Sequence, residues 1–147
     1  MADLLQEIST IIEAGTTQAG STHATWPIYR SHLPDSTDIG DRAVGLLHAA
    51  GFGDRGGAGT DRSDIERPGL QVLVRGLPLN QYSSGYVEAE AVARAVKNAL
   101  HGFSGLSSAG GTWYLGIWNE SGPGFIGWDE SGRPLFSINL RVERSKS

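Results

Sequence analysis

The sequence predicts an α+β fold, a single domain in which an N-terminal helix and a long central helix pack on a mainly antiparallel sheet of about five strands. Three stretches indicate this. Residues 70–75 and 135–142 alternate apolar and polar side chains, which is typical of strands with one buried face. Residues 86–100 repeat apolar side chains at spacings of three and four, the pattern of an amphipathic helix. A helix covering an alternating strand is the nucleus of such a fold.

The N-terminal part of the chain adds one helix and two strand candidates. Asp3 can cap the helix, and Gly15 is expected to end it. Its apolar stripe consists of Leu4, Leu5, Ile8, Ile11 and Ile12. Residues 25–30 form a short strand candidate, which Pro27 restricts to a sheet edge or a strand start. The apolar run at residues 42–49 is compatible with a strand buried on both faces.

Both ends of the central helix carry sequence signals. Ser84 can cap its first amides, and Gly102 is placed to end it in a left-handed conformation. Glu90 and Arg94 stand at i and i+4 in the order that favours an ion pair. The buried side is rich in alanine, which lets the helix lie close to the strand before it. Its expected core positions are Ala89, Val92, Ala93, Val96, Ala99 and Leu100.

The remaining segments are predicted as follows. Residues 51–66 form the longest irregular stretch, a glycine-rich loop that is either mobile or ordered by a partner. Residues 112–119 have strong strand propensity. Residues 128–134 are typical of a tight turn that joins antiparallel strands, and the charged residues 143–147 are expected to be a frayed tail.

Composition excludes several classes of protein. A net charge of −4 and a pI near 5.5, with the basic residues scattered, argue against a protein that grips nucleic acid phosphates. The absence of cysteine removes disulfides and thiolate metal sites. No stretch resembles a signal peptide or a membrane span, so we expect a soluble protein made in the cytoplasm with no membrane partner.

One motif offers an enzymatic alternative. Gly51, Gly53 and Gly56 match the GxGxxG pattern of dinucleotide-binding turns and follow a strand candidate. The pattern needs a helix starting at the glycines, because the helix amides bind the pyrophosphate. Residues 57–64 lack a helical apolar period. A plain loop is favoured, and a small nucleotide-binding enzyme is kept as an alternative.

Other catalytic candidates are weaker. None of the histidines stands at metal-ligand spacing; they are His23, His32, His48 and His101. Asp129 with Glu130 could form an acid/base pair and Ser131 or Ser137 a nucleophile, but adjacent carboxylates in a turn are usually solvated. Aromatic residues gather between positions 113 and 128 without basic neighbours, which favours core and interface over base stacking. We therefore expect no catalytic residues, no metal and no cofactor.

Three segments carry a family resemblance. Residues 67–76, the helix at 86–100 and the closing stretch 124–140 resemble the minor capsid and tail terminator proteins of long-tailed bacteriophages, also described as head-tail joining or tail completion proteins. The resemblance runs from the first helix to the last strand. It implies that residues 1–147 form one domain of this kind, a compact α+β subunit.

The resemblance also implies a function and partners. Such subunits assemble into a ring, expected to be a hexamer, that ends the tail tube and offers a docking surface to the head-side connector. The expected partners are copies of the chain itself, the tail tube protein and the head-completion or connector protein, while DNA passes through the lumen without specific binding. The expected location is the virion tail or neck, after assembly in the host cytoplasm. A head-completion or stopper protein of the neck is the nearest alternative.

Six residues are candidates for contacts between subunits or with partners. All six are charged or aromatic and fall in predicted loops or at a sheet edge. They are Trp26, Asp54, Arg55, Arg62, Asp129 and Arg133.

Overall fold

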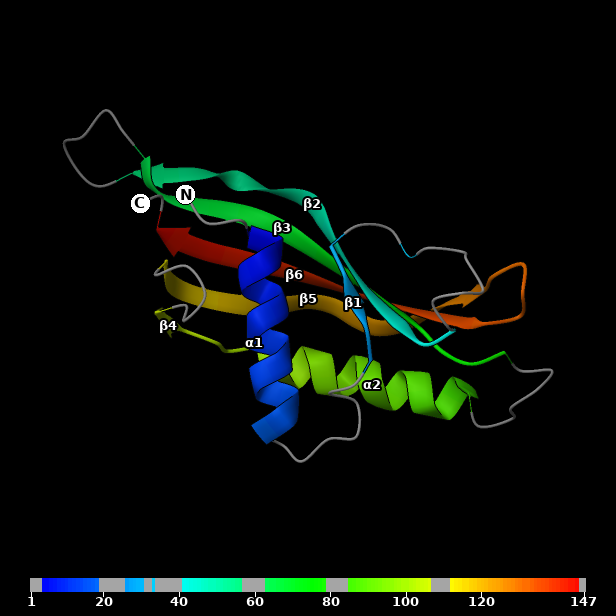
Figure 1. The fold of residues 1–147 in the computed structure, drawn as a ribbon. Coiled ribbons are helices and arrows are strands. Elements are labelled where there is room, and N and C mark those ends of the chain that lie inside the picture. Colours follow the sequence, from blue (N-terminus) through cyan, green and yellow to red (C-terminus); the bar gives the residue numbers. More distant parts are fainter. Residues whose placement is uncertain are drawn as a thin grey trace.

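The fold is one mixed sheet covered on one side by two helices (Figure 1). The computed structural model describes residues 4–18, 26–30, 33, 41–56, 63–78, 85–106 and 112–145. Its elements are α1 (Leu4–Gln18), β1 (Ile28–Tyr29), β2 (Ala43–Gly56), β3 (Ser63–Arg75), α2 (Gly85–Leu100), β4 (Gly105–Leu106), β5 (Trp113–Trp128) and β6 (Pro134–Ser145).

The sheet contains six strands in the order β1-β2-β3-β6-β5-β4. Only β1 and β2 are parallel; the other pairs are antiparallel. The outermost strands, β1 and β4, are only two residues long, so four long strands form the body of the sheet. The α+β prediction is confirmed, and β1 lies at the edge where Pro27 was expected to restrict it.

The core lies between the helices and one face of the sheet. On β3 and β6 the alternation holds as expected, and cross-strand pairs such as Val72 with Ile138 are fully buried. Five of the six expected core positions on α2 are buried as well, Ala99 being half-buried. Both helices contribute to the same continuous cluster of apolar side chains and contact each other. One apolar layer therefore holds the subunit together.

The ends of α2 agree with the sequence signals as far as the structure describes them. Gly102 has φ of +85° and ends the helix in the left-handed region. The Gly102 N–H then donates to the carbonyl oxygen of Ile117 at 2.7 Å, which ties the end of α2 to β5. The ion pair between Glu90 and Arg94 is present at 2.8 Å. Ser84, the predicted cap, lies outside the described residues.

Helix α1 is longer than predicted. Gly15 does not end it, since the helix continues to Gln18. A glycine inside a helix costs only about 1 kcal/mol relative to alanine, and packing of the apolar stripe on the core outweighs this. The stripe itself is buried as predicted. Asp3, the predicted cap, lies outside the described residues.

The prediction of an irregular loop over residues 51–66 is wrong for most of that range. Strand β2 runs to Gly56 and β3 starts at Ser63, so the segment is the distal part of an antiparallel hairpin, with residues 57–62 outside the described part. Backbone hydrogen bonds hold the distal parts of β2 and β3 together, and they do not depend on apolar side chains. The apolar pattern of the sequence therefore does not reveal this pairing. A Cβ on Gly51 would lie 2.1 Å from the Arg67 carbonyl oxygen, so this close approach requires glycine.

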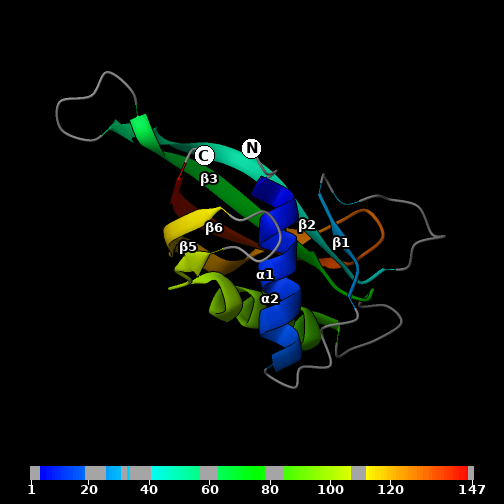
Figure 2. The ribbon, with the colours of Figure 1, turned by 60° about the vertical axis from the view of Figure 1, so that its left-hand side comes forward.

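The distal end of the hairpin lies beside the C-terminal end of β6, where Ile65 pairs with Ser145 (Figures 1 and 2). The sequence also predicted β2 as buried on both faces. Residues 43–46 are buried, but His48 and Ala49 are exposed, since no described helix covers the strand there. The two-sided burial is therefore limited to the start of β2.

The C-terminal hairpin confirms one prediction and corrects two. The turn at residues 128–134 is present, with the Gly132 N–H donating to the Asp129 carbonyl oxygen at 2.9 Å. Strand β5 continues to Trp128 rather than ending at 119. Residues 143–145 are not frayed, because β6 extends through them and Arg144 is 5% exposed. No helix in the described part of the chain is long and apolar enough to cross a membrane.

Candidate interaction surfaces

The structure places the six candidate contact residues in different environments. Trp26 is only 8% exposed and belongs to the core, with the Arg42 guanidinium 5.8 Å from its ring centroid. Arg62 lies outside the described residues. Asp54 and Arg55 lie on β2, where the structure describes the backbone but not their side chains.

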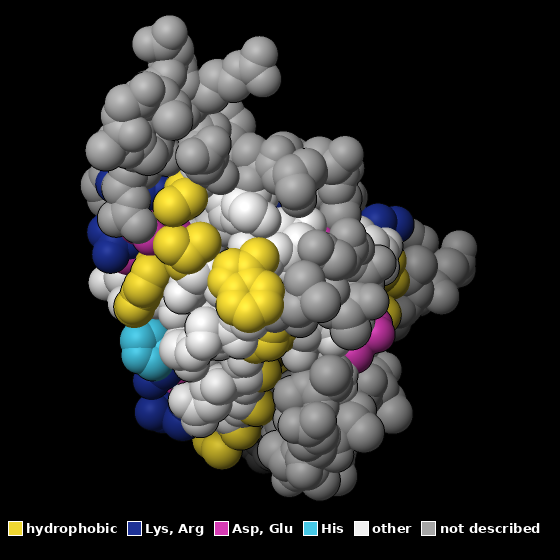
Figure 3. Space-filling view, turned by 90° about the vertical axis from the view of Figure 1, so that its left-hand side faces the viewer, with side chains coloured by type: hydrophobic (Ala, Val, Ile, Leu, Met, Phe, Trp, Pro, Cys, Tyr) yellow, Lys and Arg dark blue, Asp and Glu magenta, His cyan; other side chains and the backbone are white. Residues whose placement is uncertain are grey.

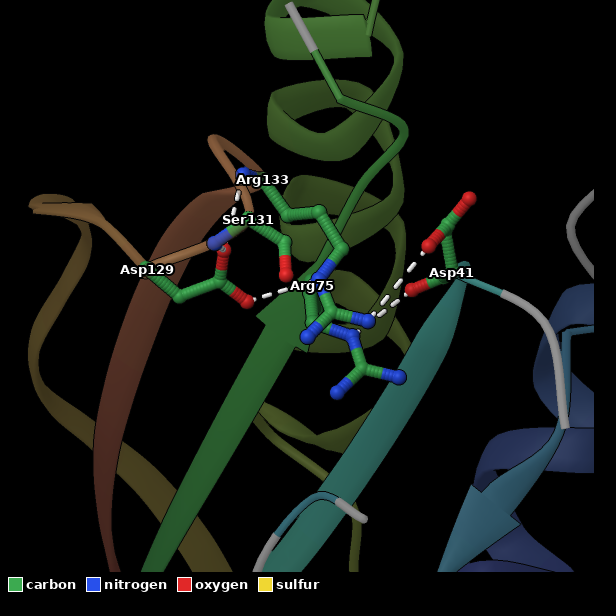
Figure 4. Close-up of polar contacts among 5 residues, drawn as sticks. All are labelled: Asp41, Arg75, Asp129, Ser131 and Arg133. Atoms are coloured by element: carbon green, nitrogen blue, oxygen red, sulfur yellow. Dashed lines mark hydrogen bonds and ion pairs between the residues drawn. The ribbon is translucent and has the colours of Figure 1, made fainter. Parts of the chain in front are cut away.

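Asp129 and Arg133 are brought together in the turn between β5 and β6 (Figure 4). One carboxylate oxygen of Asp129 accepts from the backbone N–H groups of Ser131 and Arg133, both at 2.9 Å. The other accepts from Arg133 Nε at 2.7 Å. Arg133 also lies 3.4 Å from an Asp41 carboxylate oxygen, and Arg75 Nε donates to the Asp41 carbonyl oxygen at 2.8 Å.

This turn cluster is directed inward. Burial would raise the pKa of Asp129, but the hydrogen bonds from the backbone and side chain of Arg133 outweigh it and hold the pKa below its usual value. Arg133 is 3% exposed. Asp129 therefore holds the turn together, and Arg133 fastens the turn to Asp41 in the segment before β2 within the subunit. Whether they also contact a partner stays a prediction.

A second charged cluster lies at the opposite end of β6 and was missed from the sequence. Arg144 pairs with Glu7 of α1 at 3.0 Å and with Glu66 of β3. The Tyr114 hydroxyl donates to the same Glu7 oxygen at 2.7 Å. Burial raises the pKa of Tyr114 well above its usual value, and the hydrogen bond to Glu7 adds to this. The phenol therefore remains a donor, and the cluster fixes α1 on the sheet.

Exposed large hydrophobic side chains form two groups on the described surface. Trp113 (55% exposed) and Leu115 (37%) lie at the start of β5, next to β4, and we call them the β4-end patch. Figure 3 views that end of the molecule, where hydrophobic side chains gather among polar atoms. The second group lies at the other end of β5 and at the start of α2, and we call it the turn-end patch. It contains Val87, Phe125, Ile126 and Trp128.

The turn-end patch rests on an aromatic cluster. The Tyr86 ring lies 5.2 Å from Phe125 and 6.1 Å from Trp128, measured between centroids, and Phe125 lies 5.6 Å from the buried Phe136. Such contacts hold the exposed rings in fixed positions. The sequence signal for both patches was the group of aromatic residues between positions 113 and 128, which was interpreted as core and interface.

A hollow on the outer face of α2 adjoins the turn-end patch. It has a volume of about 360 Å³ and is open to solvent. Val87, a member of the patch, lines it together with the small side chains of Ala91 and Ala95 and the polar side chains of Glu90, Arg94 and Asn98. Small residues on an exposed helix face leave room for a large side chain from another molecule.

Within the described residues, the GxGxxG motif does not form the nucleotide-binding turn that the enzymatic alternative requires. The glycines Gly51, Gly53 and Gly56 lie in β2, and the next described element is β3 rather than a helix. A helix N-terminus to hold a pyrophosphate is therefore missing from the described residues at this motif. Within the same residues, no group of three histidine, aspartate or glutamate side chains could hold a metal ion.

Comparison with known proteins connects this geometry to a family. Residues 10–146 match a family model described as "Bacteriophage tail terminator protein". A solved chain titled "Virion of native gene transfer agent (GTA) particle" is 18% identical, with a TM-score of 0.65, over 97% of this chain and 94% of that one. A second solved chain, 14% identical, gives a TM-score of 0.53 over 97% of this chain and 96% of its own. Both share the fold. None of the curated proteins matches the sequence.

Proposed function

Because this chain belongs to the bacteriophage tail terminator family, we propose that it closes into a ring that ends the phage tail tube and joins it to the head-side connector. The chain is a structural tail protein and a component of the virion. The resemblance carried by residues 67–76, 86–100 and 124–140 is thereby confirmed at the level of the family. Ring formation and the joining role are the proposal.

The observation that carries the proposal is the extent of the family match, which runs from residue 10 in α1 through α2 and every long strand. The family is described by a structural role, the termination of the tail. The protein then acts through assembly and surface complementarity rather than catalysis. A ring, with six copies as the family implies, requires a heterologous interface that closes on itself.

The proposed partners are other copies of the chain, the tail tube protein and the head-side connector. DNA passes through the ring lumen without specific binding, because a chain with a net charge of −4 repels phosphates. Asp54 and Arg55 stay candidate contacts, since they lie in the distal half of β2, at the same end of the sheet as the β4-end patch. Trp26, Asp129 and Arg133 are engaged within the subunit, so we expect smaller roles for them.

The test is assembly in the presence and absence of tail tubes. Light scattering of the purified protein should give six times the 15.6 kDa of one chain, either alone or after addition of tubes. Negative-stain images should then show rings on tube ends. A protein that stays monomeric and ignores tube ends would overturn the proposal. Binding to the isolated head connector without binding to tubes would favour a head-completion or stopper protein instead.

A further inference from the structure

Every large hydrophobic side chain that is exposed in the described part of the chain lies in one of the two patches. Isolated exposed apolar residues are normal on protein surfaces, but here they are gathered at two places. The places are the two ends of β5, a strand of 16 residues. At about 3.3 Å per residue, its ends lie at most about 50 Å apart.

We propose that the β4-end patch of one copy docks on the turn-end patch of the next copy, so that copies join head to tail. This inference rests on the proposed ring and names its interface. Two different patches at opposite ends of one element suit a heterologous contact, in which each copy uses both ends. An isologous dimer would need only one patch, which would leave the other uncovered.

The side chains of the two patches suit each other in size. The β4-end patch presents Trp113, whose indole is more than half exposed on a strand. The turn-end patch presents a cluster of aromatic rings in fixed positions. Beside Val87 it adjoins the hollow, whose lining combines Ala91 and Ala95 with the polar side chains of Glu90, Arg94 and Asn98. An exposed indole that packs on aromatic rings and alanine side chains, with polar groups beside it, is a contact expected at the centre of an interface.

Charge and area agree with this pairing. Lys97 lies in the last turn of α2, at the β4 end, and Glu130 lies in the turn next to Trp128, at the turn end; neither has an ion-pair partner among the described residues. Head-to-tail docking brings these opposite charges to one interface.

The exposed area of the patches also fits an interface of ordinary size. The six side chains expose on the order of 100 Å² each, or about 600 Å² in all. A standard interface buries about 1,600 Å², a little over half of it apolar, so the patches supply most of the apolar part.

Cross-linking tests the contact directly, because the chain has no cysteine of its own. Leu115→Cys and Ile126→Cys are prepared as separate full-length variants and treated with a short bis-maleimide cross-linker, alone and mixed. We expect cross-linked dimers in the mixture and none in either variant alone. Dimers formed by one variant alone would show a contact between identical patches and would overturn the head-to-tail arrangement. His48→Cys, exposed on β2 outside both patches, mixed with either variant is the control.

Polar substitution tests what the patches do for assembly. Trp113→Gln and Ile126→Gln should each abolish the ring while leaving the circular dichroism spectrum of the folded subunit unchanged, since both side chains are 55% exposed. Mixing the two variants should restore dimers but no ring, because the mixture contains one intact pair of patches. His48→Gln should assemble as the unaltered protein does.

The outcomes separate the inference from the proposed function. If the unaltered protein forms rings and both polar variants form them equally well, the interface assignment is wrong and the terminator function stands. If the unaltered protein forms no ring, even on tube ends, the proposed function itself fails. A variant whose circular dichroism spectrum shows that the subunit no longer folds is replaced by Val87→Gln for the turn end or Leu115→Gln for the β4 end, with the same expectation.

Discussion

Two buried arginines stand at the two ends of β6, and each is held by two carboxylates. Arg133 precedes the strand and pairs with Asp129 and Asp41, while Arg144 lies near its end and pairs with Glu7 and Glu66. Both arginines are at most 5% exposed. The chemistry is the same at the two ends, but the partners differ in burial and in distance along the chain.

The two clusters differ in how well their carboxylates are solvated once the arginine is removed. The carboxylates around Arg133 keep access to water, since the side chains of Asp41 and Asp129 are 35% and 18% exposed. Glu7 beside Arg144 is 0% exposed, and its second oxygen accepts no hydrogen bond within the described part of the chain. A buried charge without a partner is far costlier than a solvated one. The two clusters should therefore respond very differently to the same substitution.

The largest effect is expected at Arg144. Arg144→Met should lower the free energy of unfolding by about 3–5 kcal/mol, because it leaves the Glu7 carboxylate buried without a cation. Denaturant unfolding followed by circular dichroism measures this. The double variant Glu7→Gln with Arg144→Met should recover part of the loss, since it removes the stranded charge. A loss under about 1 kcal/mol for the single variant would contradict the contrast between the clusters.

A smaller effect is expected at Arg133. Arg133→Met removes the side-chain hydrogen bond to Asp129 and the ion pair with Asp41. The Asp129 carboxylate keeps its bonds from the backbone N–H groups of Ser131 and residue 133 and its access to water. We expect a loss of about 1–2 kcal/mol in the free energy of unfolding. The same denaturant titration measures it, beside Arg144→Met. Equal losses for the two variants would show that burial of the partner carboxylates does not decide the cost.

The same contrast explains which parts of the fold the sequence could predict. Asp129 and Arg133 are four residues apart in a turn with recognisable turn residues, so that turn was predicted correctly. Glu7 and Arg144 are 137 positions apart, and nothing local marks them as partners. Residues 143–145 were therefore predicted as a frayed tail. Local signals also located both strands with clean alternation and the end of α2 at Gly102.

The interaction surfaces were only partly predictable for a similar reason. The aromatic group between positions 113 and 128 was recognised, but not which of its members are exposed. Strand β5 has register shifts between Tyr114 and Gly116 and between Phe125 and Gly127, and each extra residue reverses the side to which the following side chains point. The alternating pattern is therefore lost, and the strand was predicted to end at 119. The β2–β3 hairpin was missed because its distal part is rich in glycine.

A third prediction concerns the dependence of the turn cluster on pH. The pKa of Asp129 is below its usual value in the folded protein, so its contribution to stability is complete above about pH 4 and is lost as the pH falls through the lower, folded value. Asp129→Asn should therefore be less stable than the unaltered protein near neutral pH, with the difference shrinking under acidic conditions. Denaturant titrations of both proteins at several pH values measure this. A difference independent of pH would show that the Asp129 charge contributes nothing.

The smallest effect is expected at Arg94, and it tests whether burial or sequence spacing determines the strength of an ion pair. Glu90 and Arg94 have the same spacing of four residues as Asp129 and Arg133, but their side chains are 41% and 59% exposed on α2. Water and salt screen such a pair, so Arg94→Gln should lower the free energy of unfolding by only about 0.3–0.5 kcal/mol, and less in high salt. Unfolding titrations at low and high salt, with Arg133→Met in parallel, compare the two pairs. A several-fold larger loss of stability at Arg133 would show that burial determines the strength of these ion pairs. Equal losses for the two variants would show that sequence spacing alone determines it.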